Sequence, residues 1–230
     1  ISFFNSGVSK IDGRDLYNAS TGSFSSNEGY LMLSFGASLS QKMDVGLNLK
    51  TIFNEIDQYS AKGISADIGM IYKISNDAMV SLIVDDIFGE YSWDGLSETS
   101  GSFKESLPAV SSLGLSYKIN NSIKALAKID YVNPDGLNLF RLSSGLEVDR
   151  GLYTLRVGAV QSNGVSSESF KAKLLLGAGV NIGVLRGRVV RLDYCIDFGQ
   201  ENEGISNLFS LSFIKWNILL VSYLLVLVYR

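Results

Sequence analysis

Apolar and polar residues alternate along most of the chain. Leu31, Leu33 and Phe35 share one parity, and Ser34 and Gly36 have the other. The same period of two recurs over residues 45–53, 64–73, 113–118, 123–131, 140–148, 153–159, 170–184 and 190–198. A period of two is the spacing of a β-strand, and helical spacing fits these runs less well. The pattern therefore predicts an all-β protein.

The connections between these runs are of two kinds. Short turns rich in Asn, Asp, Gly and Ser lie at residues 75–77, 120–121, 134–136 and 149–151. Longer polar connections lie at residues 57–63, 89–107, 161–168 and 200–207. We therefore expect about twelve antiparallel strands in an up-and-down meander, with short turns at one end and long loops at the other. Residues 1–214 read as a single domain.

Composition removes several classes of function. The chain has 23 Gly, 2 Pro, one Cys and no His among its 230 residues, and its formal net charge is −3. The lone Cys195 excludes an internal disulfide, and the absence of His removes the commonest general base and metal ligand. The net charge offers no basic footprint for nucleic acid. We expect a non-enzymatic protein without cofactor or metal.

The strands are long for a soluble protein and carry charges on their polar parity. They run over roughly nine to fourteen residues, against the ~9–11 that cross a tilted bilayer and the ~5–6 usual in soluble sheets. The polar parity includes isolated charged residues of both signs. We interpret them as lumen-lining candidates: Lys50, Asp67, Lys73, Lys124, Lys128, Asp130, Arg141, Glu147, Arg156, Lys171, Lys173, Arg191, Asp193 and Asp197. Most of them are expected to pair across strands and hold the shape of a barrel, and about one in five to contact a ligand.

Aromatic residues lie near strand ends on the apolar parity, where the interfacial girdles of a membrane barrel belong. They are Tyr30, Tyr72, Tyr117, Tyr131, Phe140, Tyr153, Phe198 and Phe209. Together with the long loops, they favour an antiparallel transmembrane β-barrel in a bacterial outer membrane over a soluble β-sandwich.

Several strand motifs resemble the PorV/PorQ group of bacterial outer-membrane proteins, itself related to the FadL long-chain fatty-acid transporters. The similarity covers roughly residues 28–214 and rests on residues 44–50 (DVGLNLK), 59–63 (YSAKG), 66–73 (ADIGMIYK), 80–86 (VSLIVDD), 105–108 (ESLP), 153–158 (YTLRVG), 177–179 (GAG) and 192–194 (LDY). The similarity consists of short strand motifs and includes no catalytic signature.

The resemblance implies a barrel of about fourteen strands. For the PorV side it implies a role in type IX secretion, with secretion-system or cargo proteins as partners. For the FadL side it implies the passage of hydrophobic molecules past an amino-terminal plug.

Both ends of the chain depart from this family pattern. The chain starts at Ile1 without a visible signal peptide, which we interpret as truncation inside the barrel. Residues 215–230 form an apolar tail without alternation, shorter than the ~20 residues of a spanning helix. An additional lipid-facing strand, a short membrane-inserted helix and a non-native readthrough all remain open for it.

Three functional hypotheses follow. The first is a barrel that supports secretion or surface assembly through its long loops, with Tyr91, Trp93 and Phe103 as exposed contact residues in the loop 89–107. The second is a FadL-like transporter or pore for hydrophobic or small solutes, acting through the lumen residues. The third is a soluble β-sandwich adhesin. The pair Asp85 and Asp86 is set aside as a catalytic site, because neighbours in a strand point to opposite faces.

Overall fold

The computed structural model describes residues 1–94, 103–163, 170–185, 188–199 and 204–215. Their strands are β1 (Ser2–Arg14), β2 (Ser20–Ser38), β3 (Met43–Ile56), β4 (Tyr59–Lys73), β5 (Ala78–Asp94), β6 (Phe103–Ser106), β7 (Val110–Lys118), β8 (Ile123–Val132), β9 (Leu139–Asp149), β10 (Tyr153–Asn163), β11 (Phe170–Leu185), β12 (Arg188–Asp197) and β13 (Ser206–Lys215). The short 3₁₀ helix η1 spans Pro134–Gly136. The apolar tail predicted to begin at residue 215 lies outside the described residues from position 216 onward.

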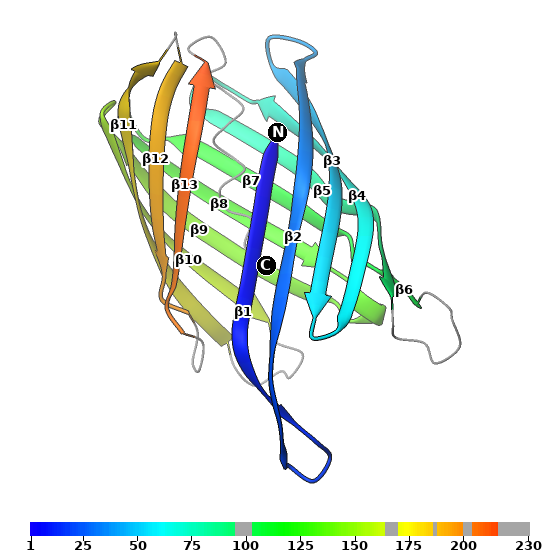
Figure 1. The fold of residues 1–230 in the computed structure, drawn as a ribbon. Helices are drawn as coiled ribbons and strands as arrows, with labels where there is room; N and C mark the ends of the chain where they lie inside the picture. The colour runs from blue at the N-terminus through cyan, green and yellow to red at the C-terminus, as the bar shows by residue number, and fades with distance from the viewer. Residues whose placement is uncertain (95–102, 164–169, 186–187, 200–203, 216–230) are drawn as a thin grey trace. The chain divides into compact units, whose positions relative to one another are not determined.

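The described strands form one 13-stranded sheet. Its order is β1-β2-β3-β4-β5-β7-β8-β9-β10-β11-β12-β13, and β6 pairs with β5 beside this path (Figure 1). Neighbouring strands such as β9, β10 and β11 run antiparallel. The predicted meander is confirmed, with β6 added to the expected strands. The sandwich hypothesis is wrong, because a sandwich needs two packed sheets.

The expected closed barrel is not what the described residues show. Closure requires the first and last strands of the meander to pair with each other. In the described part of the chain β1 and β13 stand at the two ends of the order, and the sheet is not closed between them.

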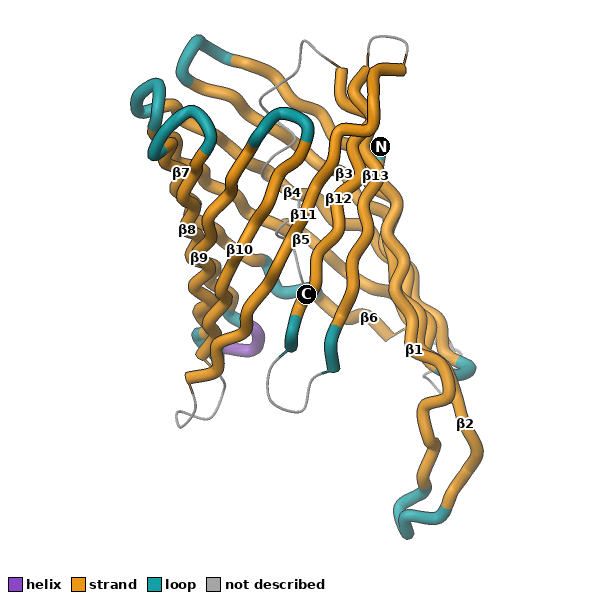
Figure 2. The backbone as a smooth tube through the Cα atoms, turned by 90° about the vertical axis from the view of Figure 1, so that its left-hand side faces the viewer, coloured by secondary structure: helices purple, strands orange, loops and turns teal. Residues whose placement is uncertain are grey.

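The chain divides into two compact units. Unit 1 comprises Ile1–Met70, Leu82–Ser111 and Val132–Asp135, and unit 2 comprises Ile71–Ser81, Ser112–Tyr131 and Gly136–Arg230. In unit 1, β2 pairs with β3 only from Ser26 onward, so that the end of β1 and the start of β2 continue as a two-stranded ribbon. Figure 2 shows the ribbon ending in a turn at residues 15–19.

The two faces of the sheet have opposite character in both units. In unit 2, Val157 lies between Leu146 of β9 and Leu176 of β11 in the register, and all three side chains are 45–48% exposed. In unit 1, Leu31 and Phe35 are exposed on the same strand that buries Met32. We call the face of the exposed apolar side chains the apolar face. The other face, which buries charged and hydroxyl side chains, is the polar face.

The aromatic positions follow this division with two exceptions. Six of the predicted girdle residues are exposed: Tyr72, Tyr117, Phe140, Tyr153, Phe198 and Phe209. Tyr30 instead packs against a buried cluster of unit 1, because it stands opposite Ile52, which belongs to that cluster. The side chain of Tyr131 is half-buried.

The predicted turns form through short polar side chains. Asn120 accepts hydrogen bonds from the backbone N–H groups of Ser122 and Ile123, both at 2.9 Å, between β7 and β8. Ser75 does the same for Asp77 and Ala78 between β4 and β5. These bonds satisfy backbone donors that the ladder leaves open at a turn. The predicted turn at residue 134 forms as η1.

The expected loop at residues 89–107 is shorter than predicted. Strand β5 continues to Asp94 and β6 returns alongside it, with Trp93 opposite Phe103. Residues 95–102 between them lie outside the described residues. Among the described residues, no helix is long and apolar enough to cross a membrane.

Candidate functional site

The polar face of unit 1 holds one cationic side chain between two carboxylates. Lys50 on β3 lies 2.6 Å from a carboxylate oxygen of Asp67 on β4 and 2.8 Å from one of Asp86 on β5. Ser65 donates a hydrogen bond of 2.8 Å to Asp86, and Asn48 donates one of 3.0 Å to Asp67. All these side chains are buried or half-buried, so the cluster joins three neighbouring strands.

Asp86 was missing from the predicted set, because its backbone interrupts the alternation of β5. Asp86 and Phe88 both have a φ of 57°, the left-handed region that non-glycine residues rarely adopt. The turn of the backbone puts Asp86 among the buried residues of the polar face and leaves Phe88 92% exposed. The N–H of Asp86 donates to Asp67 at 3.0 Å, which ties the irregular backbone to the ionic cluster. Strict alternation, on which the exclusion of Asp85 and Asp86 depended, does not hold here.

An apolar aromatic cluster follows the ionic cluster on the same face of unit 1. Its buried members are Ile52, Ala61, Tyr91 and Trp93, with Tyr30, Tyr59 and Leu107 packed against them. Ile52 comes two residues after Lys50 on β3 and therefore shares its face. The indole N–H of Trp93 donates to Glu105 of β6 at 2.8 Å.

This cluster corrects the expectation for the loop residues. Tyr91 and Trp93 are 8% and 7% exposed, whereas Phe103 is 55% exposed. The first two were expected to be solvent-facing contact residues, and they are buried because β5 continues far enough to carry them onto the packed face. Only Phe103 of the three has the expected exposure.

The polar face of unit 2 holds a chain of five charged side chains. Lys124 of β8 and Arg156 of β10 both contact Glu147 of β9 at 2.8 Å. Arg156 also reaches Asp193 of β12 at 2.8 Å, and Arg191 contacts the same carboxylate at 2.8 Å. Cations and anions therefore alternate along a chain that spans β8 to β12, with side chains from every strand of this range except β11.

Two glycines of β11 make room for this chain. Arg156 stands opposite Gly177 in the β10–β11 register, and Gly179 stands opposite Asp193 in the β11–β12 register. A Cβ at Gly179 would overlap the Asp193 carboxylate and the Arg191 guanidinium. The side chain of Arg156 therefore crosses β11 where Gly177 and Gly179 leave the polar face of that strand without side chains.

Two smaller ionic groups complete this face. Asp130 is bound by Lys128 at 3.0 Å, by Arg141 at 2.8 Å and by the hydroxyl of Ser112 at 2.7 Å. Lys173 contacts Asp197 at 2.8 Å. Asp130 and Asp197 are 3% and 2% exposed, so their charges are compensated inside the protein as burial requires.

Most of the predicted lumen residues are thus brought together in ion pairs. Lys73 lies at the end of β4, half-buried, and the side chain of Lys171 lies outside the described part of the structure. A direct ligand contact for any member of the set stays a prediction. Within the described residues, no group of three or more Cys, Asp or Glu side chains is arranged to hold a metal ion.

The sequence matches no protein-family model and no curated protein. Solved structures do match. The toluene transporter TodX of Pseudomonas putida is 11% identical, with a TM-score of 0.61 over 91% of this chain and 75% of that one. The toluene transporter TbuX of Ralstonia pickettii is 12% identical, with a TM-score of 0.60 over the same shares. A FadL homologue of Pseudomonas aeruginosa is 12% identical, with a TM-score of 0.58 over 86% of this chain and 67% of that one.

These likenesses concern the fold. The chain shares the all-β fold of TodX, TbuX and the FadL homologue, which agrees with the FadL side of the predicted resemblance at the level of fold. The finer resemblance to the PorV/PorQ group stays a prediction. TodX and TbuX are described as toluene transporters, and the third structure is described as a FadL homologue.

Proposed function

We propose that the chain is a non-enzymatic bacterial outer-membrane protein that forms the wall of a channel for small hydrophobic molecules. The observation that carries the proposal is the inverted distribution of side chains. Val157, Leu146 and Leu176 form an exposed apolar row across three strands, while Asp130 and Asp197 are buried on the opposite face. An apolar surface of this extent belongs against lipid, and membrane barrels place their polar side chains inward.

The aromatic cluster of unit 1 supports a hydrophobic solute. It places Ile52, Tyr91 and Trp93 on the polar face, directly after the Lys50 cluster along β3. A solute that follows this face therefore meets apolar surface next to charged surface. The proposal agrees with the descriptions of TodX and TbuX as toluene transporters.

Support for protein secretion is the second candidate, and it rests on the PorV/PorQ resemblance. The loop surface expected to contact partner proteins is smaller than predicted, because Tyr91 and Trp93 are buried. Phe103 is the exposed residue of the three. We therefore place transport first.

The uptake of a hydrophobic fluorescent probe by whole cells tests the transport proposal. Bacteria whose lipopolysaccharide layer excludes N-phenyl-1-naphthylamine would produce the full chain behind an export signal. Faster probe entry is expected than in cells without the chain. Heat-modifiable gel migration of the membrane fraction establishes that the chain is folded there.

A matched pair of variants locates the effect. Ile52→Lys adds a charge to the aromatic cluster and should slow probe entry, whereas Ile56→Lys, four residues later at the partly exposed end of β3, should not. Folded wild-type chain that leaves probe entry at the background rate would overturn the transport proposal.

A further inference from the structure

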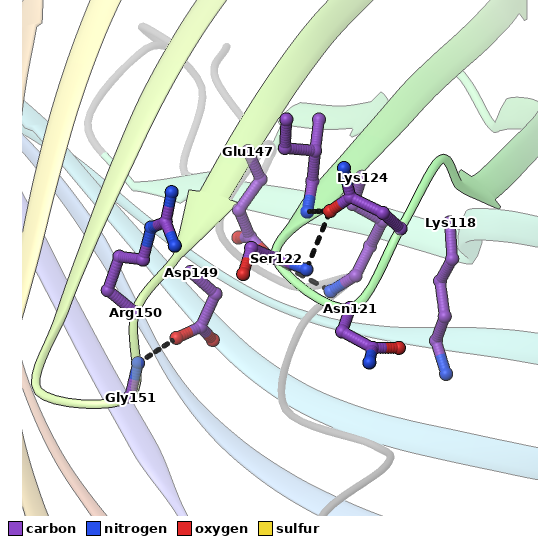
Figure 3. A pocket seen from close by; sticks show the side chains of 10 residues that line it. Lys118, Asn121, Ser122, Lys124, Glu147, Asp149, Arg150 and Gly151 are labelled. Carbon is purple, nitrogen blue, oxygen red and sulfur yellow. Dashed lines mark hydrogen bonds and ion pairs between the residues drawn. The ribbon is translucent and has the colours of Figure 1, made fainter.

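A pocket opens on the polar face of unit 2 at the end with the short turns. Its volume is about 560 Å³, inside the range of ~300–1,000 Å³ that small-molecule sites occupy. The turn between β7 and β8 and the turn between β9 and β10 form its rim. Figure 3 shows Lys118 and Arg150 on opposite sides of the group, with Lys124 and Glu147 between them.

The carboxylates of the pocket are already engaged. Glu147 contacts both Lys124 and Arg156 at 2.8 Å. Asp149 accepts a hydrogen bond of 2.7 Å from the backbone N–H of Gly151 within its own turn. Both carboxylates therefore already have partners inside the protein.

Two cations of the pocket are not engaged in this way. The side chains of Lys118 and Arg150 are exposed, and within the part of the chain that the structure describes they form no ion pair or hydrogen bond. The lining has three cationic side chains, Lys118, Lys124 and Arg150, against the carboxylates of Glu147 and Asp149. The excess charge of the pocket is positive.

The rest of the polar face of unit 2 has the same bias. Asp130 is shared by Lys128 and Arg141, and Asp193 is shared by Arg156 and Arg191. Because Arg156 also contacts Glu147, the longer group has three cations for two carboxylates, and the Asp130 group has two cations for one carboxylate. The whole chain, by contrast, has a formal net charge of −3. An excess of one sign of charge on such a wall raises the local concentration of ions of the opposite sign.

We propose that the pocket between the β7–β8 and β9–β10 turns binds a small oxyanion, a carboxylate or phosphate group, through Lys118 and Arg150. Arginine offers a planar set of donors that matches two oxygens at once, and lysine offers a mobile point charge. Asn121 and Ser122 add polar groups at the rim. This proposal goes further than the proposed transport of uncharged hydrophobic molecules and does not depend on it.

Ligand-observed NMR on the detergent-solubilised full chain tests the proposal. Acetate and acetamide have the same shape and differ in charge, so saturation transfer to acetate but not to acetamide is expected. A parallel titration with inorganic phosphate, followed through its ³¹P line width, distinguishes the two oxyanions. The oxyanion that binds with the higher affinity, acetate or phosphate, identifies the preferred group.

Variants place the binding in the pocket. Lys118→Gln and Arg150→Gln should each weaken acetate or phosphate binding by about threefold, the size of an exposed charge interaction, and the double variant should lose more. Lys42→Gln removes an exposed cation from a short turn of unit 1 and should leave binding unchanged. Equal transfer to acetate and acetamide, or full binding by the double variant, would overturn the proposal. Probe entry into cells is a separate readout and stays informative in either case.

Discussion

The guanidinium of Arg156 on β10 contacts the carboxylate of Asp193 on β12 at 2.8 Å, although β11 runs between these two strands. The contact is possible because β11 presents Gly177 and Gly179 at the crossing. It joins the Lys124–Glu147 pair to the Arg191–Asp193 pair, so that one ionic chain stabilises the register of five strands.

Filling the crossing at Gly179 should weaken this chain. Gly179→Ala places a methyl group where the Asp193 carboxylate and the Arg191 guanidinium lie, and both must shift. We expect a loss of about 1–3 kcal/mol in the free energy of unfolding, as for overpacking elsewhere in proteins. The heat-modifiable gel band followed through a urea series measures it. Gly46→Ala serves as control, because the nearest atom to its added carbon is 3.6 Å away, and an equal loss there would contradict the explanation.

The Lys50 cluster should depend on the charge of its lysine. Lys50→Met leaves Asp67 and Asp86 without their shared cation, and removal of one partner of a buried pair costs about 3–5 kcal/mol. Lys50→Arg keeps the charge and should lose clearly less stability in the same urea series.

A second substitution isolates the electrostatic part of that loss. Adding Asp86→Asn to Lys50→Met removes one of the two facing carboxylates and should restore part of the stability. Asn is also tolerated at the positive φ of this position, so the backbone is not disturbed. No recovery in the double variant would show that the loss comes from packing of the lysine stem.

Trp93 and Phe103 should differ sharply in their contribution to stability, although they are paired across β5 and β6. Trp93 is buried against Ile52 and Ala61, so Trp93→Ala should cost about 3–5 kcal/mol. Phe103 is 55% exposed, so Phe103→Ala should change stability by no more than about 0.5 kcal/mol. Unfolding in urea, followed by gel migration, distinguishes the two. Similar losses would contradict the packing described for the hairpin.

Alternation was sufficient to predict the faces of regular strands. Arg156 and Val157 are adjacent on β10, and their opposite environments follow from the period of two alone. The short turns were also predictable, because Asn120 and Ser75 satisfy backbone donors within three residues of themselves. These features depend on local chemistry, which a single sequence contains.

The partners within the candidate site were not predictable in the same way. Arg156 and Asp193 are 37 residues apart, and their contact depends on the register of two strand pairs and on the glycines between them. Asp86 was assigned to no site, because two left-handed residues change the facing of β5 at that point. The adjacent carboxylates Asp85 and Asp86, unusual within a strand, were the available signal for such an irregularity.

The apolar face gives the sharpest test of the membrane assignment. Val157 lies in the middle of β10 with apolar neighbours on both sides in the register. If this face contacts lipid, Val157→Arg should cost about 2–4 kcal/mol, the penalty for arginine near the bilayer midplane. If it faced water, the same substitution would change stability by no more than about 0.5 kcal/mol. Leu16→Arg is the control, because Leu16 is fully exposed in the turn of the β1–β2 ribbon, and it should be neutral in either case. The measurement is the urea midpoint of each variant refolded in lipid vesicles, and a neutral Val157→Arg would contradict an outer-membrane location for this sheet.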